Sequence, residues 1–393
     1  MTTFSLAATR DWLLSPECRR LDAAGLVDGL AAELTRAGLP LWRMATSLRT
    51  LHPEIWVKNL RWLRGEGAVT TSVPHELSAT REYIDNPVAR IHGGVDLLRC
   101  RLVGAQADLS FPLCAQLAVD GGTDYLILAV PFAGPRTFIS FATDDDAGFS
   151  DEHIAALVGL VPAVALRAEL ESEHDARAGL LAVYLGADAA ARVMKGAVRR
   201  GGGARLHAAI WTCDLRGFTS FSDGATPESV VETLDAYFDC TAGAVLAGGG
   251  DVLKFIGDAV LAVFPVTSDA DGGERRACRA ALAAARDAHA RIGKVNDART
   301  ARGAPVLEFG VGLHVGDVFY GNIGAGSRLD FTVIGAAVNE AVRVESLSKP
   351  LNAPIIMSEA FKSAGDVDDA VSLGAQRLKG VARSVEVFMV PLA

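Results

Sequence analysis

The sequence predicts an α+β protein made of two domains, and three observations support this. Its 393 residues are 50% hydrophobic and 22% charged, which suits a globular chain long enough for two cores. Apolar runs typical of strands alternate with segments of helical periodicity in both halves. A long helical pattern lies between the halves. We therefore expect one domain at 1–150, a helical linker at 151–200 and a second domain at 201–393.

The first half predicts a helix over Leu21–Ala37, ended by Gly38, and then several strands. The clearest strands are Tyr125–Pro131 and Thr137–Ala142, with a glycine- and proline-containing turn between them. This layout resembles a GAF-like sensor domain, a family that binds small ligands between a sheet and its helices. The resemblance implies a regulatory domain with an unknown small-molecule or ion effector.

The linker helix begins near Ser150, which is a favourable N-cap, and its apolar pattern continues to Tyr184. Such a helix could pair with its twin in a dimer, or it could simply close the first domain. The pattern leaves both interpretations open.

Charge and composition exclude several classes of function. The formal net charge of −9 argues against general binding to nucleic acid or to an anionic membrane. No run of 18 or more apolar residues and no signal peptide is found, so we expect no membrane segment. The six cysteines are scattered without the spacing of a zinc site, which predicts free thiols and a cytoplasmic protein.

The second half alternates strands and helices after a glycine-rich boundary at 199–203. The predicted elements are a strand at Leu206–Trp211, a helix begun by Thr226 and Pro227, a hairpin over Gly250–Phe264, a helix near Gly273–Ile292, a strand at Leu307–Val315, a turn at Gly316-Asp317 and a helix over Ala336–Leu347.

Charged residues occur at special places in these elements. Asp214 lies where a strand ends before a glycine and a helix start, an arrangement suited to phosphate and to a bridging metal ion. Lys254 and Asp258 lie in the apolar hairpin, where a charge is costly unless it is paired or used. Asn339 and Arg343 share one helix face. Each could instead be an ordinary solvated side chain.

Three separated motifs carry these residues: WTCDLRGFT at Trp211–Thr219, KFIGD at Lys254–Asp258 and TVIGAAVNEAVR at Thr332–Arg343. Their combination, spanning about 200–390, resembles a class III nucleotide cyclase catalytic domain. The resemblance implies a ferredoxin-like α+β fold with a mostly antiparallel sheet. It also implies a homodimer in which each active site is shared between the two chains.

The resemblance assigns metal and phosphate roles. Asp214 and Asp258 match the two metal-binding aspartates, which implies two divalent ions, Mg²⁺ or Mn²⁺. Phe218 and Thr219, at the helix start after Asp214, would lie by the substrate's phosphates. Lys379 lies where the family often has a lysine that contacts phosphate.

Base and ribose roles follow in the same way. Lys254 resembles the lysine that reads adenine, and Thr332 occupies the partner base-reading position. Threonine there resembles the class IIIb group, often described as bicarbonate-responsive. Asn339 and Arg343 resemble the pair that orients the ribose and stabilises the transition state.

The implied reaction converts ATP to 3′,5′-cyclic AMP and pyrophosphate. Lys254 is a donor only, so it can pair with N1 of adenine but not with the N1–H of guanine. The alternatives are a guanylate cyclase, disfavoured by Lys254, and a catalytically silent nucleotide-sensing module, disfavoured because all six motif residues are present.

Overall fold

The protein is described by a computed structural model that covers residues 4–392 except 133, 135, 268–271 and 379–383. The chain divides into two compact units, Met1–Leu180 and Leu181–Ala393. The division lies within the predicted linker, where helix α6 (Asp151–Leu185) runs continuously across it. The two units are described separately below.

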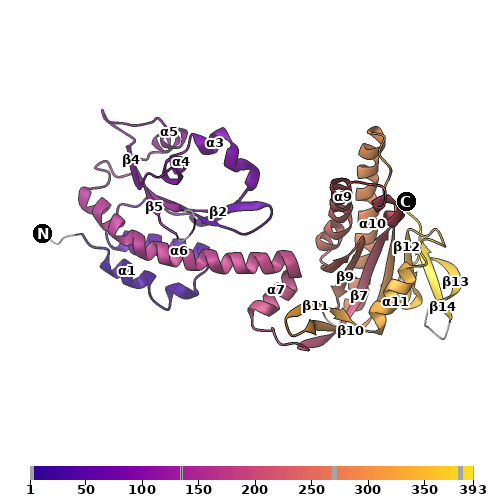
Figure 1. Ribbon diagram of the computed structural model, residues 1–393. Helices are drawn as coiled ribbons and strands as arrows, with labels where there is room; N and C mark the ends of the chain where they lie inside the picture. Colours follow the sequence, from indigo (N-terminus) through magenta and orange to yellow (C-terminus); the bar gives the residue numbers. More distant parts are fainter. Residues whose placement is uncertain (1–3, 133, 135, 268–271, 379–383, 393) are drawn as a thin grey trace. The chain divides into compact units, whose positions relative to one another are not determined.

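The first unit is built on a six-stranded sheet in the order β3-β2-β1-β6-β5-β4, with antiparallel neighbours throughout. The strands are β1 (Arg43–Arg49), β2 (Ile55–Leu63), β3 (Gly67–Pro74), β4 (Leu97–Arg101), β5 (Asp124–Val130) and β6 (Thr137–Thr143). Helices α1 (Ala7–Leu13), α2 (Ala23–Arg36) and α6 pack on one face. The other side carries η2 (His75–Ala79), α3 (Arg81–Ile84), α4 (Pro87–His92) and α5 (Pro112–Val119), as Figure 1 shows. This confirms an α+β layout, while the GAF-like identity stays a prediction.

Helix α6 is the one helix among the described residues that is long and apolar enough to cross a membrane by length and composition. Core helices pass the same test, and Leu157 and Leu160 of α6 are buried in the core of the first unit. Arg167 is also buried there, 2.9 Å from Glu171 and 2.8 Å from the carbonyl of Leu21. The absence of a membrane segment stays a prediction.

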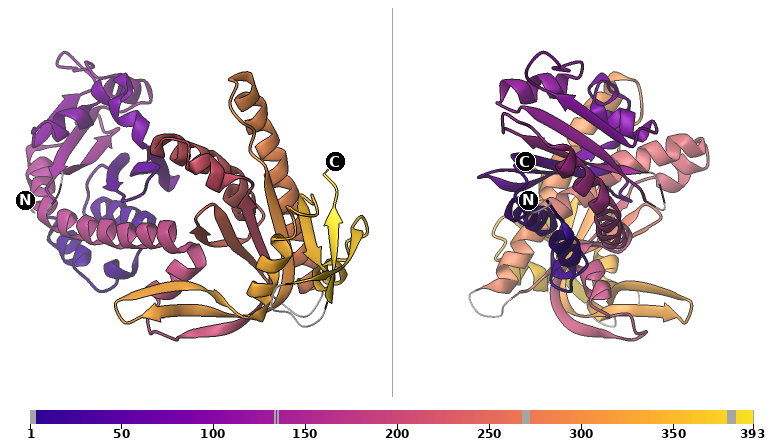
Figure 2. Two further views of the ribbon diagram at one scale, coloured as in Figure 1. Left: turned by 45° about the vertical axis from the view of Figure 1, so that its right-hand side comes forward. Right: turned by 90° about the vertical axis from the view of Figure 1, so that its left-hand side faces the viewer.

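The second unit holds an eight-stranded sheet in the order β13-β14-β12-β10-β7-β9-β8, with β11 paired to β10. Its strands are β7 (Gly203–Leu215), β8 (Asp251–Ile256), β9 (Ala259–Pro265), β10 (Phe309–Ala325), β11 (Arg328–Ile334), β12 (Ile355–Ser358), β13 (Val371–Arg377) and β14 (Ser384–Val390). Only the β10–β12 pair is parallel among these. Figure 2 shows the β10–β11 hairpin extending beyond the rest of the sheet. The predicted mostly antiparallel sheet is confirmed.

The centre of this sheet follows the order β7–α9–β8–β9–α10–β10, with the strands arranged β10-β7-β9-β8. This is the βαββαβ unit of ferredoxin-like folds. The helices of the unit are α7 (Ala187–Met194), α8 (Phe218–Ser222), α9 (Pro227–Ala247), α10 (Gly273–Ala301), α11 (Ala336–Glu345) and α12 (Glu359–Gly365).

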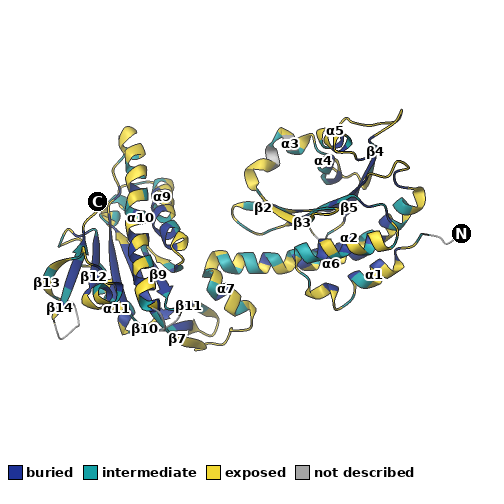
Figure 3. Ribbon diagram, turned by 180° about the vertical axis from the view of Figure 1, so that it is seen from behind, coloured by how far each residue is buried: buried dark blue, intermediate teal, exposed yellow. Residues whose placement is uncertain are grey.

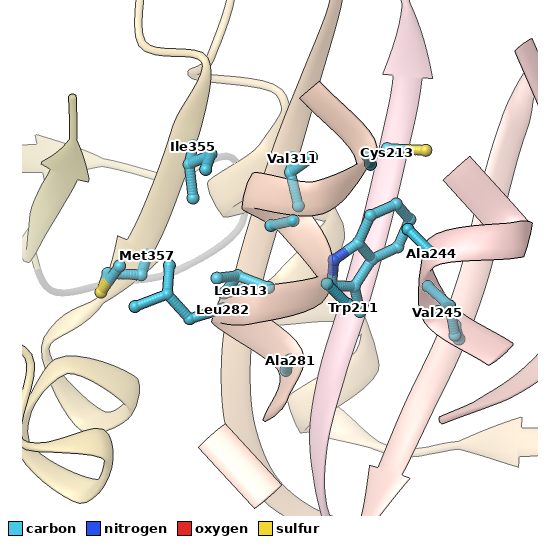
Figure 4. Packing of buried hydrophobic residues seen from close by; sticks show 14 of the residues in the cluster. Trp211, Cys213, Ala244, Val245, Ala281, Leu282, Val311, Leu313, Ile355 and Met357 are labelled. Atoms are coloured by element: carbon cyan, nitrogen blue, oxygen red, sulfur yellow. The ribbon is translucent and has the colours of Figure 1, made fainter. Parts of the chain in front are cut away.

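Helices α9 and α10 cover one face of the sheet, where Trp211 is fully buried against apolar side chains of both helices (Figure 4). Figure 3 shows exposed residues along the outer surfaces of α9 and α10 and buried residues along the strands. The opposite face holds a second cluster, in which Ile210 and Leu261 pack with Ala341 of α11. The central strands of this sheet are therefore buried on both faces.

Glycines let α11 approach β10 closely. A Cβ on Gly312 would lie 2.7 Å from the Cα of Glu345, and one on Gly316 would lie 2.9 Å from the Cβ of Ala337. The predicted turn at Gly316-Asp317 is wrong, because β10 continues through it and pairs with β7 from Phe309 to Gly321. The alternating glycines serve helix packing.

Candidate active site

The β8–β9 hairpin and the end of β7 bring two aspartates together. Gly257 takes φ 64° in the turn, a left-handed conformation that favours glycine, and Asp258 follows it. The β7–β9 register pairs Cys213 with Val260. Asp214 is one residue beyond Cys213 and Asp258 two before Val260, so the two carboxyl groups lie at the same end of neighbouring strands.

The electrostatics show that these carboxyl groups interact. Burial, together with the negative charge of Asp258, raises the pKa of Asp214 to about 6. Two adjacent carboxylates repel each other, and a divalent cation would relieve that repulsion. Hard oxygen ligands of this kind suit Mg²⁺ or Mn²⁺. In the described part of the chain no cluster of three or more His, Cys, Asp or Glu residues is placed to hold a metal ion, so this two-carboxylate pair is the candidate anchor.

A third carboxylate, Glu345 at the end of α11, was missed by the sequence analysis. Burial and the charge of Asp214 raise its pKa to about 7, and the hydroxyl of Ser348 donates to its Oε1 at 3.1 Å. Glu345 therefore adds to the negative potential at the aspartate pair. An acidic residue in the last turn of a helix interacts unfavourably with the helix dipole. This unfavourable placement was the sequence signal that could have singled out Glu345.

Phe218 and Thr219 begin the short helix α8, whose N-cap Gly217 has φ 75°. Phe218 is half-buried and packs against the core under α9 and α10. Thr219 is exposed. The structure thus places Thr219 at the surface and gives Phe218 a packing contact. Lys379 lies outside the described residues.

Lys254 projects from β8 toward β11. Its Nζ is 3.3 Å from Oδ2 of Asp330, a partner that the sequence did not reveal. A β-bulge between Val252 and Lys254 sets Lys254 opposite Leu261, on the face of the sheet that α11 covers. The ion pair holds the ammonium group beside the strand that also carries Thr332.

Thr332 is 4% exposed, and its Oγ1 has no hydrogen-bond partner among the described residues. A buried hydroxyl without a partner is costly. Because Oγ1 is enclosed in this structure, contact with a purine requires the side chains around it to move.

Asn339 and Arg343 lie one turn apart on α11, with Asn339 exposed and Arg343 half-buried. Neither side chain makes a hydrogen bond or ion pair within the described part of the chain. Both donors are therefore available for a ligand.

The predicted site residues form two groups within one chain. Asp214 and Asp258 face each other, and the cation that acts on Asp214 is Lys349. Lys254 instead contacts Asp330. One chain therefore holds the acidic pair and Lys254 at separate places.

Comparisons with known proteins identify the second unit. Residues 207–389 match the family model described as the adenylate and guanylate cyclase catalytic domain. An adenylate cyclase of Anabaena cylindrica is 33% identical over 189 residues, which cover 46% of this chain and 36% of that protein. Adenylate cyclase 1 of Rhizobium meliloti is 32% identical over 178 residues, covering 45% of this chain and 26% of that protein.

The crystal structure of the adenylyl cyclase CyaB from P. aeruginosa is 28% identical with a TM-score of 0.44, over 48% of this chain and 96% of that chain. The second unit of the protein is a nucleotide cyclase catalytic domain. Over residues 207–389 it matches the class III adenylate and guanylate cyclase family. The chain spans about a third or less of the length of these two curated relatives.

Proposed function

We propose that the protein is an adenylate cyclase that converts ATP to 3′,5′-cyclic AMP and pyrophosphate. The observation that carries this proposal is the facing pair formed by Asp214 at the end of β7 and Asp258 at the tip of the β8–β9 hairpin, within the domain that matches the cyclase family. The hydroxyl of Thr332 and the side chains of Asn339 and Arg343, which have no hydrogen-bond partner among the described residues, support it.

In this reaction the ribose 3′-oxygen attacks the α-phosphorus in line, and pyrophosphate leaves. Asp214 and Asp258 would hold two divalent cations, Mg²⁺ or Mn²⁺, which when bound supply charge neutralisation and make the 3′-hydroxyl more acidic. Arg343 donates to the phosphoryl oxygens, where negative charge grows in the transition state. Asn339, one turn away, orients the ribose.

Base selection rests on Lys254 and Thr332. The ammonium of Lys254 donates to N1 of adenine, and the hydroxyl of Thr332 accepts from the adenine amino group. Asp330 keeps the ammonium in place before substrate binds.

The separate locations of the two residue groups favour a homodimer with shared sites. Asp214 and Asp258 of one chain would meet Lys254, Thr332, Asn339 and Arg343 of the other, and a two-fold axis would create two equal sites. The first unit would act as a GAF-like regulatory sensor. The charge of −9 disfavours a nucleic-acid partner, and the six free thiols favour a reducing, cytoplasmic location.

The direct test is a cyclase assay. The purified full chain is incubated with ATP or GTP and with Mg²⁺ or Mn²⁺, and cyclic nucleotides are separated by chromatography. We expect cyclic AMP as the main product. Cyclic GMP as the main product would favour the guanylate cyclase alternative, and no cyclic product with either metal would favour a silent nucleotide-sensing module.

Replacing Lys254→Glu is expected to lower the ratio of kcat/KM for ATP to that for GTP at least about tenfold, because a carboxylate accepts from guanine and repels adenine N1. The matched variant Glu359→Lys, which changes an exposed charge at the start of α12 and away from the base-reading strands, should keep the wild-type ratio. An unchanged ratio in Lys254→Glu would remove this residue from base recognition.

Millimolar Mn²⁺ is expected to raise the melting temperature of the full chain by several °C, since a ligand that binds only the folded state stabilises it. Asp258→Asn should abolish this shift and slightly raise the metal-free melting temperature, because it removes the repulsion on Asp214. Asp297→Asn, an exposed position on α10, is the control and should respond like wild type. An equal Mn²⁺ shift in Asp258→Asn would contradict the assignment.

A further inference from the structure

The two faces of the first unit's sheet differ, because one is apolar throughout and the other combines an apolar cluster with several polar side chains. Met44 and Leu48 of β1 lie on the face that packs against α2 and α6. Alternation places Arg43 and Ser47 on the opposite face. The register extends this second face across the sheet, because paired residues point to the same side. Its polar members are Arg43, Ser47, Asn59, Arg61, Thr71, Ser140 and the hydroxyl of Tyr125.

This polar face forms the floor of a cavity of about 430 Å³, a volume that suits a small organic ligand. The far wall comes from η2, α3, α4 and α5, and includes Leu77, Val88 and Leu113. Aromatic side chains complete it. Trp56 and Tyr83 lie edge to face with ring centroids 5.3 Å apart, and the Tyr83 hydroxyl is 2.6 Å from Nδ1 of His92.

The charged side chains that line the cavity are positive. Two guanidinium groups, from Arg43 and Arg61, line the cavity, while its described lining includes no carboxylate. The carboxylate nearest Arg61 is that of Glu66, at 4.0 Å and exposed. Asp120 lies close enough to act on the charge of Arg43, but neither it nor Asp124 lines the cavity.

Arg43 is the more informative of the two. Its side chain makes no hydrogen bond or ion pair with any described residue, although it is half-buried. Burial lowers the pKa of this guanidinium, because desolvation disfavours the charged form. An arginine nevertheless stays protonated, and a buried charge without a partner is costly. A bound anion would satisfy it with two parallel hydrogen bonds.

We propose that this cavity binds a small organic anion whose carboxylate or phosphate group pairs with Arg43 and whose flat apolar body lies against Trp56 and Tyr83. Arg61 adds a second positive charge at the same floor. The anion is the effector of the first unit, and this regulatory role rests on the proposed cyclase function. The binding of the anion to the cavity does not depend on that function.

The test uses the full chain and three probes of one shape: benzoate, phenyl phosphate and the neutral benzamide. Melting temperature and isothermal titration calorimetry report binding without any need for cyclase activity. The variants are Arg43→Gln, Arg43→Lys and the control Arg90→Gln, which removes an exposed arginine of α4 that does not line the cavity.

We expect benzoate or phenyl phosphate to bind wild type and Arg90→Gln equally, and benzamide at least about tenfold more weakly, because it lacks the charge. Arg43→Gln should lose at least about tenfold in affinity for the anion, with Arg43→Lys in between. Preference between benzoate and phenyl phosphate identifies the anionic group. If Arg43→Gln does not fold, Arg43→Lys still tests the proposal, because lysine keeps the positive charge but cannot donate two parallel hydrogen bonds to the anion.

The proposal is overturned if benzamide binds as tightly as the anions, if Arg43→Lys and Arg43→Gln bind like wild type, or if none of the probes binds at millimolar concentration. Cyclase activity measured separately on the same preparations distinguishes this failure from a failure of the proposed function. An active enzyme that binds no anion rejects only the cavity assignment.

Discussion

A heterodimer of one Lys254→Ala chain and one Asp258→Ala chain is expected to regain about half of wild-type cyclase activity, although each parent homodimer has about 1% or less. The physical reason is the separation of the two groups within one chain, where Lys254 contacts Asp330 and Asp258 faces Asp214. In a two-fold dimer with shared sites, one site of this heterodimer has both residues intact and the other has neither.

The measurement requires pure heterodimers. Two affinity tags, one on each variant, allow co-expressed chains to be isolated by sequential purification before the activity with ATP is measured. A simple equal mixture that exchanges freely should show about a quarter of wild-type activity, because half of the dimers are heterodimers with one working site.

A second heterodimer makes the result decisive. Wild type paired with a chain that carries both Lys254→Ala and Asp258→Ala should be inactive if sites are shared, because each site then contains one defective residue. If each chain held its own complete site, this pair would keep half of the activity and the first heterodimer would be inactive. That reversed outcome would reject shared sites.

The sequence predicted the acidic pair because the signals are local. Gly257 marks the turn of the hairpin, and the apolar strands on either side fix its register against β7. The two aspartates therefore lie close together, because the strand ends that carry them can be recognised from the hydrophobic pattern of the sequence. The buried thiols of all six cysteines also followed from composition and are confirmed.

What the sequence did not predict depends on contacts far apart in the chain. Lys254 and Asp330 are separated by 76 positions, and their meeting depends on the β-bulge before Lys254, which side-chain alternation does not reveal. Glu345 reaches the acidic pair only because α11 lies directly on β10. The turn expected at Gly316 was wrong for the same reason, since that glycine makes room for a helix. The ligand cavity of the first unit likewise requires the paired register of several strands.

The close approach of α11 to β10 leads to the second large expected effect. Gly312→Ala should destabilise the protein by about 1–3 kcal/mol, because the added Cβ would lie 2.7 Å from the backbone of Glu345, where no side-chain rotation can relieve the clash. Helix α11 must shift, and it carries Asn339 and Arg343. A displacement near 1 Å can lower catalysis about 10²-fold, so we expect kcat to fall far more than the loss of folded protein explains.

Gly293→Ala is the matched control for this substitution. Gly293 is exposed within α10, where an added Cβ meets nothing within 4 Å. Alanine is the better helix former there, so this variant should gain about 0.5–1 kcal/mol in stability and keep wild-type activity. Denaturant unfolding and the ATP assay on the same samples separate the two effects. If Gly312→Ala matched wild type in both measurements, the contact between α11 and β10 would not be what positions Asn339 and Arg343.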